Sequence, residues 1–405
     1  MIKLVKTYWL PIVVLFVVFF DELFNCTAIV GGFSVESGMK QYEAMLLAAI
    51  GYSMMGNDLV KGRITKRDHR TLVVLFAILF LYMLTPLFYG ETQEKHTTYL
   101  LVYGAECIPG AYIGIRFAKS GTLQIINDLL PFAVIPISFL IGTIGITAAM
   151  MGETVNKNSG YGVEEGLNYQ TLSYYMAFCY TYAFFYVFYG YKKSGLFNLF
   201  LRIAMAVDML FCVIVCLLGG GRGAFVYMVA ITLFLLFYYL KSSKKHRGHA
   251  FIIISALVIT ALYFIVNLGI TQSAGLERVT GTLTDDNTRL ELFNSAFDAF
   301  LTSPLFGRGV GSIWWTVGFY SHNEILDLLA ETGLIGTIFL LSIVWRVTIK
   351  LYRLSNIDKN YLFILLVMTG VLMNCMFSCY YIAALKIYFV CSLVYCLPGR
   401  SKQMS

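Results

Sequence analysis

Apolar stretches of about 20 residues recur along the whole chain, and each is long enough to cross a hydrocarbon layer about 30 Å thick as a helix. The chain is 58% hydrophobic and only 13% charged, which is more apolar surface than one aqueous globule can hide. The sequence therefore predicts an all-α, polytopic membrane protein that forms a single integral membrane domain over residues 1–405. It excludes a soluble enzyme, a nucleic-acid-binding domain and a disordered protein. About twelve spans are expected, over residues 4–20, 42–57, 71–89, 99–118, 131–151, 171–190, 202–219, 223–240, 250–268, 334–350, 361–378 and 380–397.

The charges between these stretches predict the orientation of the chain. With the amino terminus in the cytoplasm, the cytoplasmic segments hold 22 Lys and Arg against four acids, while the outer segments hold seven against 17 acids. This asymmetry follows the positive-inside rule, so both termini are expected on the cytoplasmic side. The net charge of +7 therefore indicates membrane insertion and not a nucleic-acid partner. Lys3 and Lys6 precede the first apolar stretch and no A-x-A-like cleavage site follows, which indicates an uncleaved first span.

One outer segment, residues 269–333, is much longer than the other loops and has helical patterning of its own. Loops of this length in compact chains are usually functional or disordered, and the pattern here favours a functional, partly helical loop. Within the spans, Glu106 and Asp208 are intramembrane acids and hence candidates for function, the alternative being pairing with polar groups of other spans. The nine cysteines lack metal-ligand spacing, so we expect no metal and no cofactor.

Arg289 lies at the first of three expected helix starts on the outer side. Thr288 and Glu291 have the spacing of a capping box, which places Arg289 in the first turn of the helix. A cation is unfavourable at this positive end of a helix unless an anion binds there. The alternative is pairing of Arg289 with Asp285 or Asp286. These two acids could suggest a metal site, but helix capping explains them more simply.

His322 lies at the second expected start. Ser321 and Glu324 have capping-box spacing, so His322 is expected in the first turn of a helix over 324–331 that stops at Gly333. The positive helix end disfavours imidazolium, and a neutral imidazole near pH 7 can act as a general base. The alternative is a surface or structural histidine.

Arg222 lies at the third expected start, after the glycine run 219–221. The glycines allow a tight turn and a close backbone approach to a ligand, and the alternative is an arginine that anchors the helix at the membrane interface. Guanidinium groups grip phosphate oxygens bidentately, so Arg222 and Arg289 suit a diphosphate. Arg308 is a weaker third candidate, because it lies in a glycine-rich run, 307–311, that we interpret as a flexible turn.

These residues together resemble the signature of a known family, the O-antigen ligase and O-antigen polymerase superfamily of bacterial inner-membrane glycosyltransferases. The family signature is a histidine, then Asn, Ser or Gln, nine residues, a glycine, two residues and a Gly, Thr or Tyr. The matching pieces are His322-Asn323 with Gly333 and Gly336, Arg222-Gly223, Arg289-Leu290, and the run from Ser303 to Gly309. The motif-bearing part covers about residues 222–336, and the first half of the chain resembles the family only in hydropathy.

The resemblance implies a fold, a reaction and roles for the candidate residues. It implies about twelve spans with one large periplasmic loop, 269–333, as the catalytic loop. It implies transfer of a glycan from undecaprenyl diphosphate to an acceptor sugar hydroxyl, with inversion and without a metal. Arg222 and Arg289 then bind the diphosphate and His322 activates the acceptor. The implied partners are the lipid-linked oligosaccharide donor, a glycan acceptor, membrane lipid and a chain-length regulator.

The resemblance leaves the acceptor open. A polymerase accepts another lipid-linked repeat unit, whereas a ligase accepts lipid A-core. A pattern of some polymerases, an arginine followed after ten residues by glycine, is absent, because Leu233 and Phe300 occupy those positions after Arg222 and Arg289. The short separation between Arg289 and His322 favours a polymerase, since we expect a longer insertion there in ligases. A protein-glycosylating member and a flippase of the lipid-linked glycan are the further alternatives.

Overall fold

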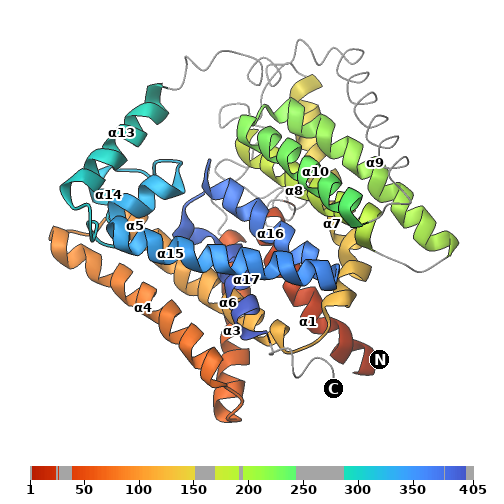
Figure 1. The fold of residues 1–405 in the computed structure, drawn as a ribbon, viewed down its shortest axis with the longest axis horizontal. Coiled ribbons are helices and arrows are strands. Elements are labelled where there is room, and N and C mark those ends of the chain that lie inside the picture. The colour runs from red at the N-terminus through yellow and green to blue at the C-terminus, as the bar shows by residue number, and fades with distance from the viewer. Residues whose placement is uncertain are drawn as a thin grey trace. The chain divides into compact units, whose positions relative to one another are not determined.

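The computed structural model describes residues 2–23, 26, 39–150, 169–190, 195–242, 287–377 and 379–397 (Figure 1). Every regular element within these ranges is a helix, which confirms the all-α class. The expected span 250–268, and the parts of the outer loops over 151–168 and 269–286, lie outside the described residues.

Five described helices are long and apolar enough to cross a membrane. They are α4 (Lys66–Tyr89), α7 (Leu123–Met150), α9 (Leu196–Gly219), α10 (Arg222–Ser242) and α15 (Glu324–Ile357). Helices α1 (Ile2–Val18), α16 (Asn360–Cys375) and α17 (Leu385–Cys396) contain shorter apolar stretches. The chain is thus an integral membrane protein, and the expected number of twelve spans stays a prediction.

Two expected spans are less regular than the hydropathy suggested. The span at 99–118 is divided by the π-helical turn η2 (Tyr103–Cys107) between α5 (Glu94–Val102) and α6 (Ile108–Ala118). The span at 380–397 begins with the 3-10 turn η7 (Tyr381–Ala383), and its α-helix has only 12 residues. At about 1.5 Å per residue, a helix of that length rises roughly 18 Å, which is too short to cross the hydrocarbon layer alone.

The contacts divide the chain into two compact units. The first unit contains residues 1–18, 41–123 and 283–405, and the second contains residues 19–40 and 124–282. The expectation of a single integral membrane domain stays a prediction. Arg289 and His322 lie in the first unit and Arg222 lies in the second.

In the second unit α8 (Tyr169–Phe185) packs against α9 and α10, as Figure 1 shows. Helix α7 contacts α9 where Gly142 approaches Phe211. Gly220 ends α9 in a left-handed conformation with φ 74°, and α10 begins at Arg222, as the glycine run predicts. The backbone N–H of Gly221 donates to Ser173 Oγ at 3.0 Å. A Cβ at Gly221 would lie 2.6 Å from that of Ser173, so this glycine is needed for packing against α8.

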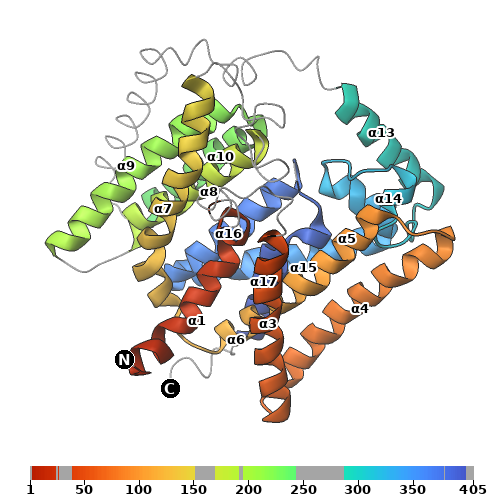
Figure 2. The ribbon, with the colours of Figure 1, turned by 180° about the vertical axis from the view of Figure 1, so that it is seen from behind.

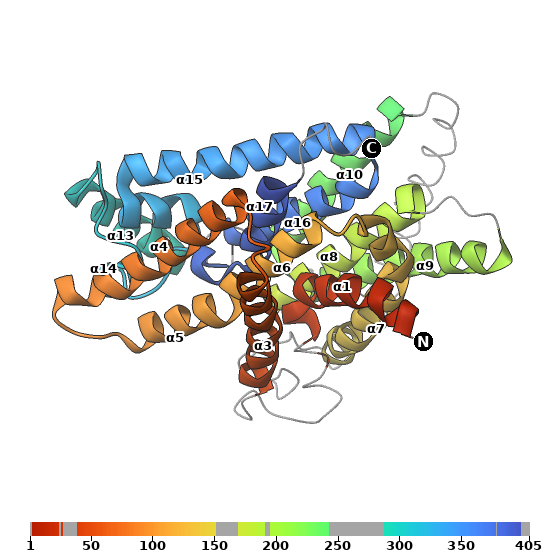
Figure 3. The same cartoon turned by 90° about the horizontal axis from the view of Figure 1, so that it is seen from below.

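The first unit is built around α6 and α17, which pack with glycine at the contact. A Cβ at Gly114 would lie 2.4 Å from the carbonyl oxygen of Phe389, so the two helices approach more closely than larger residues allow. Around this pair lie α3 (Met39–Val60), α4 and α5 (Figure 2). Figure 3 shows α13 (Asn287–Thr302) and α14 (Ile313–Thr316) near the N-terminal end of the long helix α15, where the candidate residues lie.

Candidate functional site

His322 directly precedes helix α15. The N-cap of α15 is Asn323, whose side-chain oxygen accepts from the backbone N–H groups of Ile325 at 3.1 Å and Leu326 at 3.4 Å. The expected Ser321–Glu324 capping box is therefore wrong, and His322 lies before the helix and not in its first turn. Asn323 outcompetes Ser321 because asparagine is among the best N-cap residues and lies next to the first helical residue.

His322 has the backbone conformation that L-residues avoid. Its φ is 61°, and it is the only non-glycine residue with positive φ in the part of the chain that the structure describes. The neighbouring residues form a tight set of hydrogen bonds. Ser321 Oγ donates to the carbonyl oxygen of Asn323 at 3.1 Å, the Asn323 N–H donates to Ser321 Oγ at 3.2 Å, and the Ser321 N–H donates to Asp327 Oδ1 at 2.9 Å. The imidazole is half-buried against the rings of Phe319 and Tyr320.

Helix α15 is broken at Gly333, as the sequence predicts, and continues beyond the break. Gly333 has φ 63° and ψ −170°, which breaks the helical hydrogen bonding at that point. A loop before α14 supplies the missing partners. The N–H groups of Arg308 and Gly309 donate to carbonyl oxygens before the break, at 3.0 and 2.9 Å, and Leu334 and Ile335 donate back into the loop, at 2.8 and 3.2 Å.

Docking of this loop, residues 304–309, onto the break in α15 requires a glycine in the loop and a glycine in the helix. A Cβ at Gly333 would lie 2.4 Å from the carbonyl carbon of Leu305, and a Cβ at Gly307 would lie 2.3 Å from the backbone of Glu331. The run 307–311, expected to be a flexible turn, is instead fixed against the broken helix. The expectation was wrong because the partners of the loop lie more than 20 residues away in the sequence.

Arg289 and His322 belong to the same unit, and each acts on Tyr320, Arg289 through its charge and His322 through ring contact. Arg289 is half-buried in the first turn of α13, as predicted, although Thr288 lies inside that helix and does not cap it. Burial raises the pKa of Tyr320, and the nearby Arg289 guanidinium acts to lower the pKa of this phenol. The Tyr320 ring meets the His322 imidazole edge to face, with 4.6 Å between centroids. Helix α13 packs against α15 within the first unit, and a role for Arg289 beside His322 stays a prediction.

An aromatic cluster supports this neighbourhood. Trp314 of α14 packs against Tyr99, Tyr320 and Tyr380, and its indole N–H donates to the Tyr82 hydroxyl at 3.0 Å. Motif reasoning missed these residues, although the high aromatic content and the Trp-Trp pair in the outer loop were visible in the sequence. Stacked and edge-to-face rings with satisfied polar groups make a rigid support.

Lys95 is a second positive charge near Tyr320 and His322 that the sequence reasoning also missed. Its ammonium lies 4.5 Å from the centroid of the Phe319 ring, a cation–π distance. Phe319 in turn stacks on Tyr320, with ring centroids 4.4 Å apart.

Three buried acids lie on one face of the first part of α15, at Glu324, Asp327 and Glu331. The spacing of three and four residues was visible in the sequence and places them on one side of a helix. Glu331 accepts hydrogen bonds from the hydroxyls of Tyr380 at 2.6 Å and Tyr381 at 2.7 Å. Buried carboxylates need such partners, so Glu331 ties the segment before α17 to α15.

The remaining arginine candidates, Arg308 and Arg222, lie in different surroundings. Arg308 is exposed in the docked loop, and its carbonyl oxygen accepts from the Tyr89 hydroxyl at 3.4 Å. Arg222 is the first residue of α10 and half-buried in the second unit, so its approach to Arg289 and His322 stays a prediction. The neighbouring Gly221 approaches Ser173 of α8, which accounts for the close backbone packing there without a ligand.

Both intramembrane acids are buried. Asp208 of α9 accepts from the Ser138 hydroxyl of α7 and from the Cys212 thiol at 3.9 Å, so its contacts join two helices of the second unit. Glu106 lies in the π-helical turn η2, an irregularity that often marks functional positions. A functional role for either acid stays a prediction.

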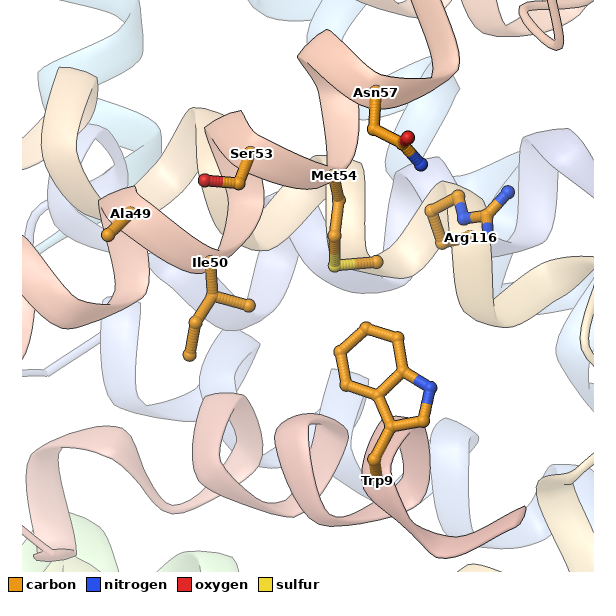
Figure 4. Close-up of a pocket in the computed structure, with 7 residues that line it drawn as sticks. All are labelled: Trp9, Ala49, Ile50, Ser53, Met54, Asn57 and Arg116. Atoms are coloured by element: carbon orange, nitrogen blue, oxygen red, sulfur yellow. The ribbon is translucent and has the colours of Figure 1, made fainter. Parts of the chain in front are cut away.

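The described residues also form a pocket of about 540 Å³ away from His322. Figure 4 shows its lining side chains, which come from α1, α3 and α6. They are Trp9, Ala49, Ile50, Ser53, Met54, Asn57 and Arg116. The Arg116 guanidinium donates to Asp58 at 3.2 Å, so its charge is already balanced. We assign no catalytic role to this pocket.

Metal ligands do not gather in the described ranges, where no group of three or more His, Cys, Asp or Glu could hold an ion. Asp285 and Asp286, the metal alternative from the sequence, lie outside the described residues. The expected absence of a metal therefore stays a prediction.

Comparison with known proteins agrees with the motifs. Residues 208–341 match the family model described as O-antigen ligase, over roughly a third of the chain. The match contains Arg222, Arg289, His322 and both ends of the docked loop. No curated protein and no solved structure matches the chain.

These observations define the class of protein: an integral membrane enzyme of the glycosyltransferase type. Over residues 208–341 the chain is similar to the O-antigen ligase family.

Proposed function

We propose that this protein polymerises lipid-linked oligosaccharide repeat units of an O-antigen or a related surface polysaccharide. It would transfer the growing glycan from undecaprenyl diphosphate to a sugar hydroxyl of the next repeat unit. The observation that carries the proposal is the match of residues 208–341 to the O-antigen ligase family, in which Arg289 lies on α13, His322 directly precedes the cap of α15, and these two helices pack against each other.

The chemistry follows from the residue types. His322 takes the proton from the acceptor hydroxyl, and that oxygen attacks the anomeric carbon of the donor sugar from the face opposite the diphosphate. The new glycosidic bond forms as the bond from the sugar to the diphosphate breaks, which inverts the anomeric configuration. Arg289 and Arg222 stabilise the charge of the departing undecaprenyl diphosphate, with Arg308 as the weaker third candidate. The mechanism needs no metal, because guanidinium groups supply the positive charge.

The location follows from the charge pattern and the family. We place the protein in the bacterial inner membrane, with both termini in the cytoplasm and His322 on the periplasmic side. The apolar spans shelter the polyprenyl chain. Partners are the lipid-linked donor, the acceptor, membrane lipid and a chain-length regulator.

Ligation to lipid A-core is the second candidate, because the matching family model is described as O-antigen ligase. The donor and the roles of the arginines and His322 are the same in both reactions. The short segment between Arg289 and His322 favours the polymerase, since it leaves little chain for a separate acceptor-binding insertion.

The deciding experiment supplies purified protein with lipid-linked repeat units alone and then with added lipid A-core. A ladder of lengthening glycans identifies a polymerase, and product only after addition of lipid A-core identifies a ligase. Movement of the lipid-linked glycan across vesicles without new bonds would show a flippase and overturn the proposal.

His322→Ala tests the assignment of the base. We expect it to abolish transfer while membrane insertion and folded yield stay at the level of the unmodified protein. His69→Ala is the matched control, because His69 is exposed in the first turn of α4, outside the candidate site. Normal transfer by His322→Ala would remove the base assignment.

A further inference from the structure

The left-handed backbone of His322 requires an explanation. An L-residue with positive φ brings its Cβ too close to the following carbonyl oxygen, and such residues persist only where their surroundings hold them. Asn and Asp tolerate this conformation through local hydrogen bonds of their side chains, and glycine lacks the clash. Histidine occurs in this region more often than most residues, yet the conformation still costs energy, so other residues must fix it.

Besides the Ser321–Asn323 hydrogen bonds, Asp327 makes a hydrogen bond that reaches across His322 and ties residue 321 to the body of α15. Its Oδ1 accepts from the backbone N–H of Ser321 at 2.9 Å, on the other side of His322 in the chain. Asp327 is itself held in place, because its N–H donates to the carbonyl oxygen of Asn323 at 3.1 Å and its side chain is fully buried. Residues 321 and 323 are therefore both fixed to the same point of α15, and the backbone between them has to turn.

We infer that Asp327 is the positioning residue that holds His322 in its left-handed conformation and so aims the imidazole at the acceptor. This inference rests on the proposed function of His322 as the base. Asp327 acts through the backbone of Ser321 and does not react with the substrate. The cap at Asn323 has a different effect, because its bonds to Ile325 and Leu326 fix the start of the helix and not the residue before His322.

The kinetic test compares two variants of Asp327. Asp327→Ala removes the acceptor, and we expect kcat to fall about tenfold or more, equivalent to about 1.4 kcal/mol, with KM for the lipid-linked donor unchanged. Asp327→Asn keeps an oxygen that can accept from Ser321, and we expect its kcat to stay within about threefold of the unmodified protein. Asp298→Ala is the control, because Asp298 is exposed on α13. Equal losses in both Asp327 variants would overturn the positioning role.

A second measurement does not depend on activity. Selective 13C labelling of histidine gives one backbone signal for each of the five histidines, and the His322 signal is the one missing in His322→Ala. We expect the carbonyl and Cα shifts of His322 to move in Asp327→Ala and to stay in Asp327→Asn. An unchanged His322 signal in Asp327→Ala would overturn the inference. If the signal moves as expected but His322→Ala still transfers glycan, the inference about conformation stands and the proposed role of His322 fails.

Discussion

Gly333→Ala is the sharpest test of the broken helix. Gly333 has φ 63° and ψ −170°, a region that only glycine occupies without strain, and an alanine there costs about 1–3 kcal/mol. The new Cβ would lie 2.4 Å from the Leu305 carbonyl carbon, so the docked loop must also move. Displacement of the loop would weaken or break the four backbone hydrogen bonds that join it to α15. Each of these bonds makes a net contribution of about 0.5–1.5 kcal/mol. We expect the free energy of unfolding to fall by roughly 3 kcal/mol or more.

The matched control is Gly90→Ala. Gly90 has φ 71° and ψ 1° at the end of α4, and nothing lies within 4 Å of an added Cβ. This substitution carries the backbone strain alone, about 1–2 kcal/mol. The free energy of unfolding of both variants is measured in detergent, together with their glycan transfer. The difference between Gly333→Ala and Gly90→Ala separates the effect of loop docking from that of backbone strain. Equal destabilisation by the two substitutions would refute the docking of the loop onto Gly333.

Three further outcomes are expected. Arg289→Lys should lower glycan transfer at least about tenfold without loss of folded protein, because lysine cannot form the bidentate fork; activity equal to that of the unmodified enzyme would indicate a structural arginine. A chelator should leave glycan transfer unchanged. Inhibition that is reversed by added divalent metal would indicate a metal site at Asp285 and Asp286. Burial lowers the pKa of His96, which lies beside the Tyr82 carbonyl oxygen at 3.0 Å. The stability that His96 contributes is therefore fully present above its pKa in the unfolded chain, about 6.5, and is lost as the pH falls below that pKa. His96→Gln should reduce the dependence of the melting temperature on pH between pH 7 and 5.

The elements that sequence reasoning predicted are those encoded by neighbouring residues. The apolar stretches, the turn before Arg222, and the helix that begins at residue 324 and breaks at Gly333 all depend on patterns within about 20 residues. The cap of α15 was missed by two positions, because Ser321 and Asn323 are both good N-caps and only the fold shows which one the helix uses. Boundaries of this kind depend on competition between adjacent residues.

The missed parts of the site depend on contacts between distant segments. Lys95 reaches Phe319 from α5, and Tyr380 reaches Glu331 from the segment before α17. Neither contact leaves a periodic signal in the sequence. The same is true in part of Gly307, whose need for glycine comes from the backbone of Glu331 as well as from its own φ of 70°.

The spacing of the histidine motif has a direct structural meaning. Asn323 caps the helix, the nine residues that follow form its first part, and Gly333 breaks it where the loop docks. Nine residues rise about 13.5 Å, so the motif fixes the distance between His322 and the point where α15 is held by the loop. Insertion of one residue between Glu331 and Gly333 would turn the helix face that carries Asp327 and Glu331 by about 100° relative to the break. The nine-residue interval thus specifies both the distance and the rotation of the candidate base relative to its support.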